Sequence, residues 1–100
     1  MIRYIYSKML ERANEMEEQL PALIQNDDWQ AIKNVCTFPT DEWDGPAATN
    51  YHMLLNEAVN AKNNILVSQL PDFIRKQVDK TQRADHEMAE RIRRNFSSLF

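Results

Sequence analysis

The sequence predicts an all-α protein, a small bundle of three long helices and one short helix. Apolar residues recur at steps of three and four along most of the chain, which is the spacing of amphipathic helices. The 100 residues include a single glycine, too few for the tight turns that a sheet protein of this size needs. A chain of this length has room for one core, so residues 1–100 are expected to form one domain.

The first helix is expected over residues 2–20, where apolar positions form one face and charged residues fill the other. Pro21 is expected to end or kink this helix, because a proline disfavours α geometry at the residue before it. A shorter helix is expected over residues 28–37, since the Asn-Asp-Asp run at 26–28 supplies an N-cap.

Residues 38–45 are expected to form a loop that leads into a third helix over residues 46–68, with Pro46 in its first turn. A last helix is expected over residues 71–98. The short connection between these two helices allows an antiparallel hairpin or a kinked rod, and the hairpin is expected because it buries more apolar surface. The apolar positions of the last helix are spaced near 3.5 residues, with Asp85 as the one interruption: Ile74, Val78, Thr81, Met88, Ile92, Phe96 and Leu99.

The net charge of −3 is too small for a DNA mimic and has the wrong sign for a general nucleic-acid binder. It is also uneven, because residues 1–50 are acidic and residues 71–100 are basic, so that the two parts could attract each other within or between chains. The single cysteine, Cys36, fits a reducing compartment. The first residues contain no apolar run long enough for a signal peptide or membrane span, so a cytoplasmic protein without membrane association is expected.

No enzyme is expected from this sequence. The soft metal ligands are His52, His86 and Cys36, and no two of them have the spacing of a metal site. The chain also lacks the motif of a serine nucleophile and the glycine-rich loop of a phosphate site. We therefore expect no catalytic residue, no metal and no cofactor.

Asp41, Glu42, Trp43 and Asp44 form a candidate protein-binding loop. Tryptophan is enriched at the centres of protein interfaces, and the surrounding acids would select a basic partner. The alternative is that Trp43 folds back to close the end of the bundle while Asp44 caps the third helix.

Two further sets of polar residues are candidates. Basic residues on the last helix could bind a phosphate backbone, although interspersed acids such as Glu87 and Glu90 also fit a solvated, salt-bridged face. A polar stripe on the third helix could bind a polar ligand or a second copy, or could simply face solvent. The basic set is Lys76, Lys80, Arg83, Arg91 and Arg94, and the polar stripe is His52, Asn56, Asn60 and Asn63.

The leading functional hypothesis is a small cytoplasmic regulator or inhibitor, encoded by a phage or a bacterium, that binds a protein target. The apolar stripes exceed what one small core absorbs, which predicts self-association, most simply a two-fold dimer. The alternatives are a nucleic-acid-binding helical dimer that uses the basic last helix and a structural or assembly subunit of a larger particle.

Overall fold

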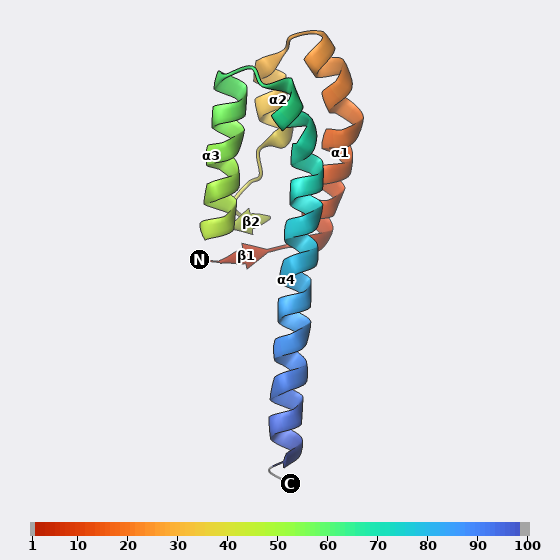
Figure 1. Cartoon of the computed structure of the whole chain (residues 1–100), viewed down its shortest axis with the longest axis vertical. Coiled ribbons are helices and arrows are strands. Elements are labelled where there is room, and N and C mark those ends of the chain that lie inside the picture. The colour runs from red at the N-terminus through yellow and green to blue at the C-terminus, as the bar shows by residue number, and fades with distance from the viewer. Residues whose placement is uncertain (1, 99–100) are drawn as a thin grey trace.

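The computed structural model describes the chain over residues 2–98 and its side chains over residues 2–95. The prediction of an all-α protein is confirmed, because four helices account for most of the described chain (Figure 1). The elements in chain order are β1 (Arg3–Tyr4), α1 (Tyr6–Gln25), α2 (Trp29–Cys36), β2 (Trp43–Asp44), α3 (Pro46–Asn60) and α4 (Asn64–Ser98).

The first helix begins at Tyr6, so the prediction that it starts at residue 2 is wrong. Arg3 and Tyr4 instead form β1, which pairs antiparallel with β2 in the register Arg3 to Asp44 and Tyr4 to Trp43. The amide of Ile5 adds a hydrogen bond to a backbone carbonyl of the loop before β2, at 2.9 Å. These partners lie about forty residues away in the sequence, where helical periodicity carries no information about them.

Pro21 lies inside α1, which continues to Gln25, so the predicted end at residue 20 is also wrong. A proline within a helix removes one backbone hydrogen bond and crowds the preceding turn. Leu20 is buried and Leu23 and Ile24 pack against the core, so apolar contacts on both sides of Pro21 hold the last turn in helical geometry.

The turn between α3 and α4 lies at residues 61–63, not at the predicted connection at 68–71. Lys62 has a positive φ of 52°, and the side chain of Asn63 accepts a hydrogen bond from the amide of Leu66 at 3.0 Å. This cap starts α4 at Asn64 and leaves Pro71 within the helix, packed in the core. The predicted break at Pro71 is therefore wrong. As at Pro21, buried apolar residues on both sides of the proline, here Leu70 and Ile74, hold the chain in helical geometry.

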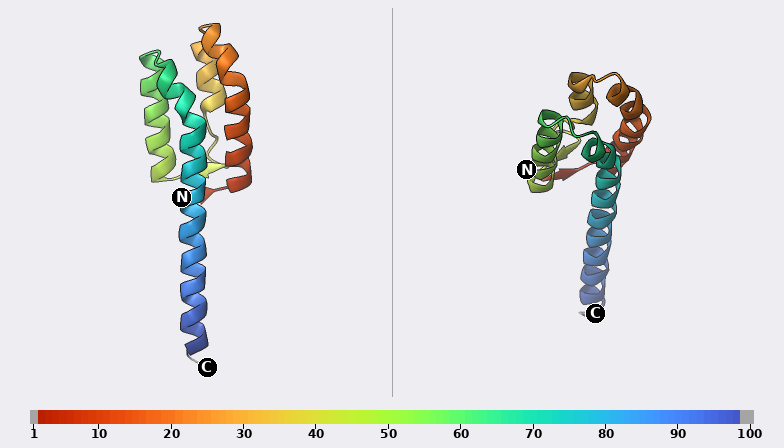
Figure 2. Two further views of the ribbon diagram at one scale, coloured as in Figure 1. Left: turned by 45° about the vertical axis from the view of Figure 1, so that its right-hand side comes forward. Right: turned by 45° about the horizontal axis from the view of Figure 1, so that its top comes forward.

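The core lies among α1, α2, α3 and the first half of α4. The turn at 61–63 reverses the chain, so that α3 and the start of α4 run side by side in opposite directions, while α4 also packs along α1 (Figures 1 and 2). The molecule measures 63 × 23 × 21 Å because α4 continues well past the other helices. The buried residues are Met9, Ala13, Met16, Leu20, Ile32, Cys36, Phe38, Trp43, Ala48, Tyr51, Leu55, Ala58, Val67, Leu70, Pro71, Ile74 and Val78.

Candidate interaction surfaces

The second half of α4 projects beyond the bundle (Figure 1). Val78 is the last buried residue of the described chain, and residues 82–95 are exposed apart from the half-buried Glu90. We call residues 82–98 the projecting segment, which spans about 25 Å at 1.5 Å per residue. Helices in proteins gain most of their stability by packing an amphipathic face, and the described side chains of the projecting segment, residues 82–95, show no such burial.

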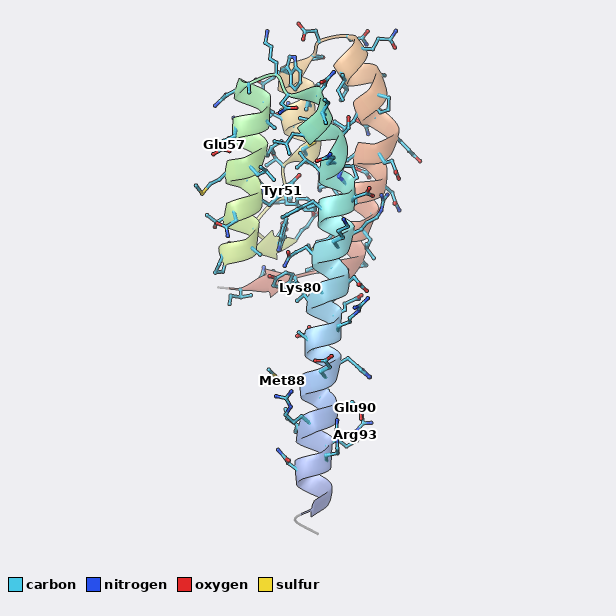
Figure 3. The ribbon with its side chains drawn as sticks, in the orientation of Figure 1. Tyr51, Glu57, Lys80, Met88, Glu90 and Arg93 are labelled. Atoms are coloured by element: carbon cyan, nitrogen blue, oxygen red, sulfur yellow. The ribbon has the colours of Figure 1, made fainter. Side chains whose placement is uncertain are left out.

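The apolar side of α4 continues into the projecting segment. Ile74 and Val78 are buried, whereas Met88 and Ile92 are 64% and 55% exposed. Met88 follows Ile74, and Ile92 follows Val78, by about four helical turns, so all four side chains lie on the same side of α4. Figure 3 shows Met88 on one side of the helix and Glu90 and Arg93 on the other. Two further residues predicted on this stripe, Phe96 and Leu99, lie outside the described side chains.

Asp85 marks the place where the projecting segment leaves the bundle. The hydroxyl of Tyr6 donates a hydrogen bond to Oδ2 of Asp85. Burial of the hydroxyl, together with this hydrogen bond and the negative charge of Asp85, raises the pKa of Tyr6 to about 12. Asp85, which interrupts the apolar stripe, is therefore hydrogen-bonded to the first turn of α1.

The predicted basic residues Lys76, Lys80, Arg83, Arg91 and Arg94 are all exposed on α4. Acidic neighbours are interspersed among them, as the sequence indicated. Arg83 forms an ion pair with Asp79 at 2.7 Å, and Glu90 pairs with Arg93 at 3.3 Å. The basic residues thus face solvent on a surface that also carries acidic side chains.

Trp43 in the predicted protein-binding loop is a core residue. Its side chain is 1% exposed, and its ring packs against Phe38 and Tyr51 with centroids 5.2 Å apart in each pair. The indole Nε1 is buried and has no hydrogen-bond partner. Trp43 therefore closes the end of the bundle, the alternative that the sequence left open, and it presents no surface to a partner.

The acids of the same loop have different roles. Glu42 forms a half-buried ion pair with Arg12 at 3.2 Å. Asp44 accepts a hydrogen bond from the amide of Gly45 at 2.8 Å, and the N-cap of α3 is Gly45, so the predicted capping of α3 by Asp44 is wrong. Asp41 is exposed. Of the four residues of the predicted loop, Asp41 is exposed and Glu42 and Asp44 are half-buried.

The predicted polar stripe of His52, Asn56, Asn60 and Asn63 does not form one site. His52 Nε2 accepts a hydrogen bond from the amide of Phe38 at 3.1 Å, and Nδ1 lies 2.8 Å from the carbonyl oxygen of Ala48. This arrangement requires a neutral ring with its proton on Nδ1, and burial lowers the pKa of His52. Asn63 caps α4, while Asn56 and Asn60 face solvent.

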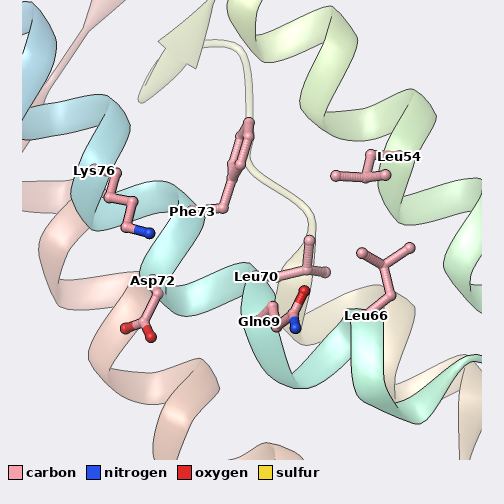
Figure 4. Close-up of a pocket in the computed structure, with 7 residues that line it drawn as sticks. All are labelled: Leu54, Leu66, Gln69, Leu70, Asp72, Phe73 and Lys76. Atoms are coloured by element: carbon pink, nitrogen blue, oxygen red, sulfur yellow. The ribbon is translucent and has the colours of Figure 1, made fainter.

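A shallow groove of about 450 Å³ lies between α3 and α4 (Figure 4). Its wall includes Phe73, whose ring stacks on that of Tyr51 at a centroid distance of 6.1 Å. Local sequence patterns do not predict this groove, because it forms only where the turn at 61–63 brings two helices together. The lining residues are Leu54, Leu66, Gln69, Leu70, Asp72, Phe73 and Lys76.

Comparison with known proteins gives no relative for this fold or these surfaces. No protein family, curated protein or solved structure matches the chain. Within residues 2–98, no group of three or more His, Cys, Asp or Glu side chains could hold a metal ion. No helix in this part of the chain is long and apolar enough to cross a membrane. Any functional assignment therefore depends on the surfaces described above.

Proposed function

We propose that this protein is a protein–protein interaction module in which two copies pair through their projecting segments. The observation that carries this proposal is the apolar side of α4, which is buried in the bundle at Ile74 and Val78 and uncovered at Met88 and Ile92. Burial of a side chain of this size contributes about 1.5–3 kcal/mol. Pairing two segments covers four such side chains and supplies each helix with the packing that it lacks.

The biological role proposed for the module is that of a regulator or inhibitor that acts by binding a protein target. Its location is proposed to be the cytoplasm. Cys36 supports that location, because it is a free and fully buried thiol, and free thiols are the usual state of cysteine in a reducing compartment.

The proposed pairing is tested by light scattering after size-exclusion chromatography over a range of protein concentrations. The unmodified chain is expected to elute with the mass of a dimer. Met88→Glu is expected to raise the dissociation constant by about tenfold or more, because pairing would bury an unpaired carboxylate.

His86→Glu is the matched control, because it adds one carboxylate to the opposite side of the same exposed helix. It is expected to leave the mass unchanged. A monomer at every concentration, or equal effects of the two variants, would contradict pairing through this side of α4. Association without a defined end point would instead favour an assembly subunit.

Nucleic-acid binding by the basic side of α4 is the second candidate. Lys80, Arg91 and Arg94 are exposed, and none of them forms an ion pair with an acidic side chain among residues 2–95. This candidate predicts that labelled RNA or DNA binds at low salt and that affinity falls steeply with added salt. Fluorescence anisotropy of a mixed oligonucleotide pool measures both, and the absence of any shift at low salt would eliminate this candidate.

A further inference from the structure

The bundle has a distinct end surface next to the place where α4 leaves it. We call this surface, formed by β1, β2 and the turn before β2, the underside. Ile2 and Ile5, on either side of β1, are 68% and 39% exposed. Asp41 is exposed and Asp44 is half-buried beside them in the sheet and its turn. The underside therefore combines the apolar Ile2 and Ile5 with Asp41 and Asp44, and β1 adds the half-buried Arg3.

The far part of the projecting segment has the opposite charge. Arg91, Arg93 and Arg94 are exposed within two turns of helix, and the described chain has no acid after Glu90. Arg93 pairs with Glu90, whereas Arg91 and Arg94 form no ion pair with any acidic side chain that the structure describes. The basic part of α4 lies in the half of the helix that projects away from the underside of its own bundle (Figure 1).

The direction in which two projecting segments pair decides whether these charges meet. In an antiparallel pair centred near residue 90, the far end of one segment reaches the level of residue 82 of the other. The underside lies near this level, because Tyr6, two residues after Tyr4 of β1, contacts Asp85. In a parallel pair, the arginines of one copy lie beside the same arginines of the other. The two Asp85 carboxylates then also face each other, whereas antiparallel pairing separates them by about 15 Å along the helix axis.

From these observations we infer that the two copies pair antiparallel and that the basic end of each α4 binds the underside of the other bundle. The inference rests on the proposed dimer and assigns its geometry. One occupant then covers both exposed apolar surfaces at this end of the molecule, the Met88 and Ile92 side of α4 and the Ile2 and Ile5 surface below the sheet. The attraction between the arginines of one copy and the acids on the underside of the other contributes more to the direction of pairing than to the affinity of the dimer.

Electron spin resonance on the full-length protein measures the direction of pairing. A spin label at Lys80→Cys, on an exposed position near the underside, reports one distance between the two copies. The antiparallel pair places the labels about 30 Å apart along the axis, whereas the parallel pair places them at the same level. Cys36 takes no label, because it is fully buried and burial raises the pKa of its thiol to about 12.

A charge-reversal variant tests the contact with the underside. Asp41→Lys is expected to raise the dimer dissociation constant severalfold, and this difference should shrink in high salt. Glu18→Lys is the matched control, since it reverses an exposed acid on α1 that no ion pair holds. It is expected to leave the dissociation constant unchanged.

The possible outcomes separate the inference from the proposed function. A dimer with a short distance between labels would overturn the antiparallel geometry but keep the dimer. An antiparallel dimer on which Asp41→Lys and Glu18→Lys act equally would overturn the contact with the underside. A monomer at all concentrations would remove both the inference and the proposed pairing.

Discussion

Tyr6 donates a hydrogen bond to Asp85 and so joins the first turn of α1 to α4 at the level where α4 leaves the bundle. The two residues are 79 positions apart in the sequence. Their contact marks the boundary between the half of α4 that the bundle covers and the half that projects.

Removal of this hydrogen bond is expected to loosen the base of the projecting segment. Tyr6→Phe should lower the free energy of unfolding by about 0.5–1 kcal/mol, the net contribution of a typical hydrogen bond. Hydrogen exchange of the α4 amides near Asp85 should become faster. Tyr4→Phe is the control, because the structure gives the Tyr4 hydroxyl no hydrogen bond, and its effect should be smaller. Equal effects would show that the contact with Asp85 does not hold the helix.

Trp43 is expected to be one of the most sensitive positions for stability. Trp43→Ala removes a large ring from the buried cluster with Phe38 and Tyr51, and such changes cost about 3–5 kcal/mol. Trp29→Ala should cost less, because Trp29 is only half-buried. Urea denaturation followed by circular dichroism measures both variants. If the two cost the same, Trp43 is not the core residue that this packing indicates.

The stability of the fold is expected to fall as the pH is lowered below about 6.5. Burial lowers the pKa of His52, so the folded state binds fewer protons at this ring than the unfolded state does. Stability from His52 is therefore complete above the unfolded pKa and is lost as the pH falls through the folded pKa. Protonation would place an N–H group at Nε2, opposite the amide of Phe38.

Urea titrations at several pH values between 8 and 5 measure this dependence. Subtraction of the profile of His52→Gln removes the contribution of the carboxylates, so the difference between the two profiles should decrease toward acidic pH. Parallel profiles for His52→Gln and the unmodified chain would contradict a role for the neutral ring.

Gly45 is expected to tolerate no side chain. Its φ of 116° is rare for residues with a Cβ, and an added Cβ would lie 3.3 Å from Cγ1 of Ile2. Gly45→Ala should lower the free energy of unfolding by about 1–3 kcal/mol, the cost of such strained backbone. Pro46→Ala, at the next position, should cost less than about 1 kcal/mol. Thermal unfolding compares the two, and a Gly45→Ala variant as stable as Pro46→Ala would contradict the strain.

Several expectations could be formed from local patterns alone. The helix over residues 29–36 and the start of α3 at Pro46 follow from nearby capping and turn residues. The predicted apolar face of the first helix is also confirmed, since Met9, Ala13, Met16 and Leu20 are buried. Of the candidate site residues, the sequence indicated an exposed basic side of α4 but could not tell whether Trp43 was surface or core.

The sequence by itself determined that the chain is helical and where its amphipathic faces lie. The reason is that the contacts that stabilise a helix join residues three or four positions apart. Only the tertiary structure decided that Trp43 and His52 belong to the interior, that residues 3–4 pair with 43–44, and that α4 runs through Pro71. These features depend on partners far along the chain. The tertiary structure likewise decided that the apolar side of α4 is covered as far as Val78 and open beyond it. This limit depends on how far the elements packed against α4 extend along it.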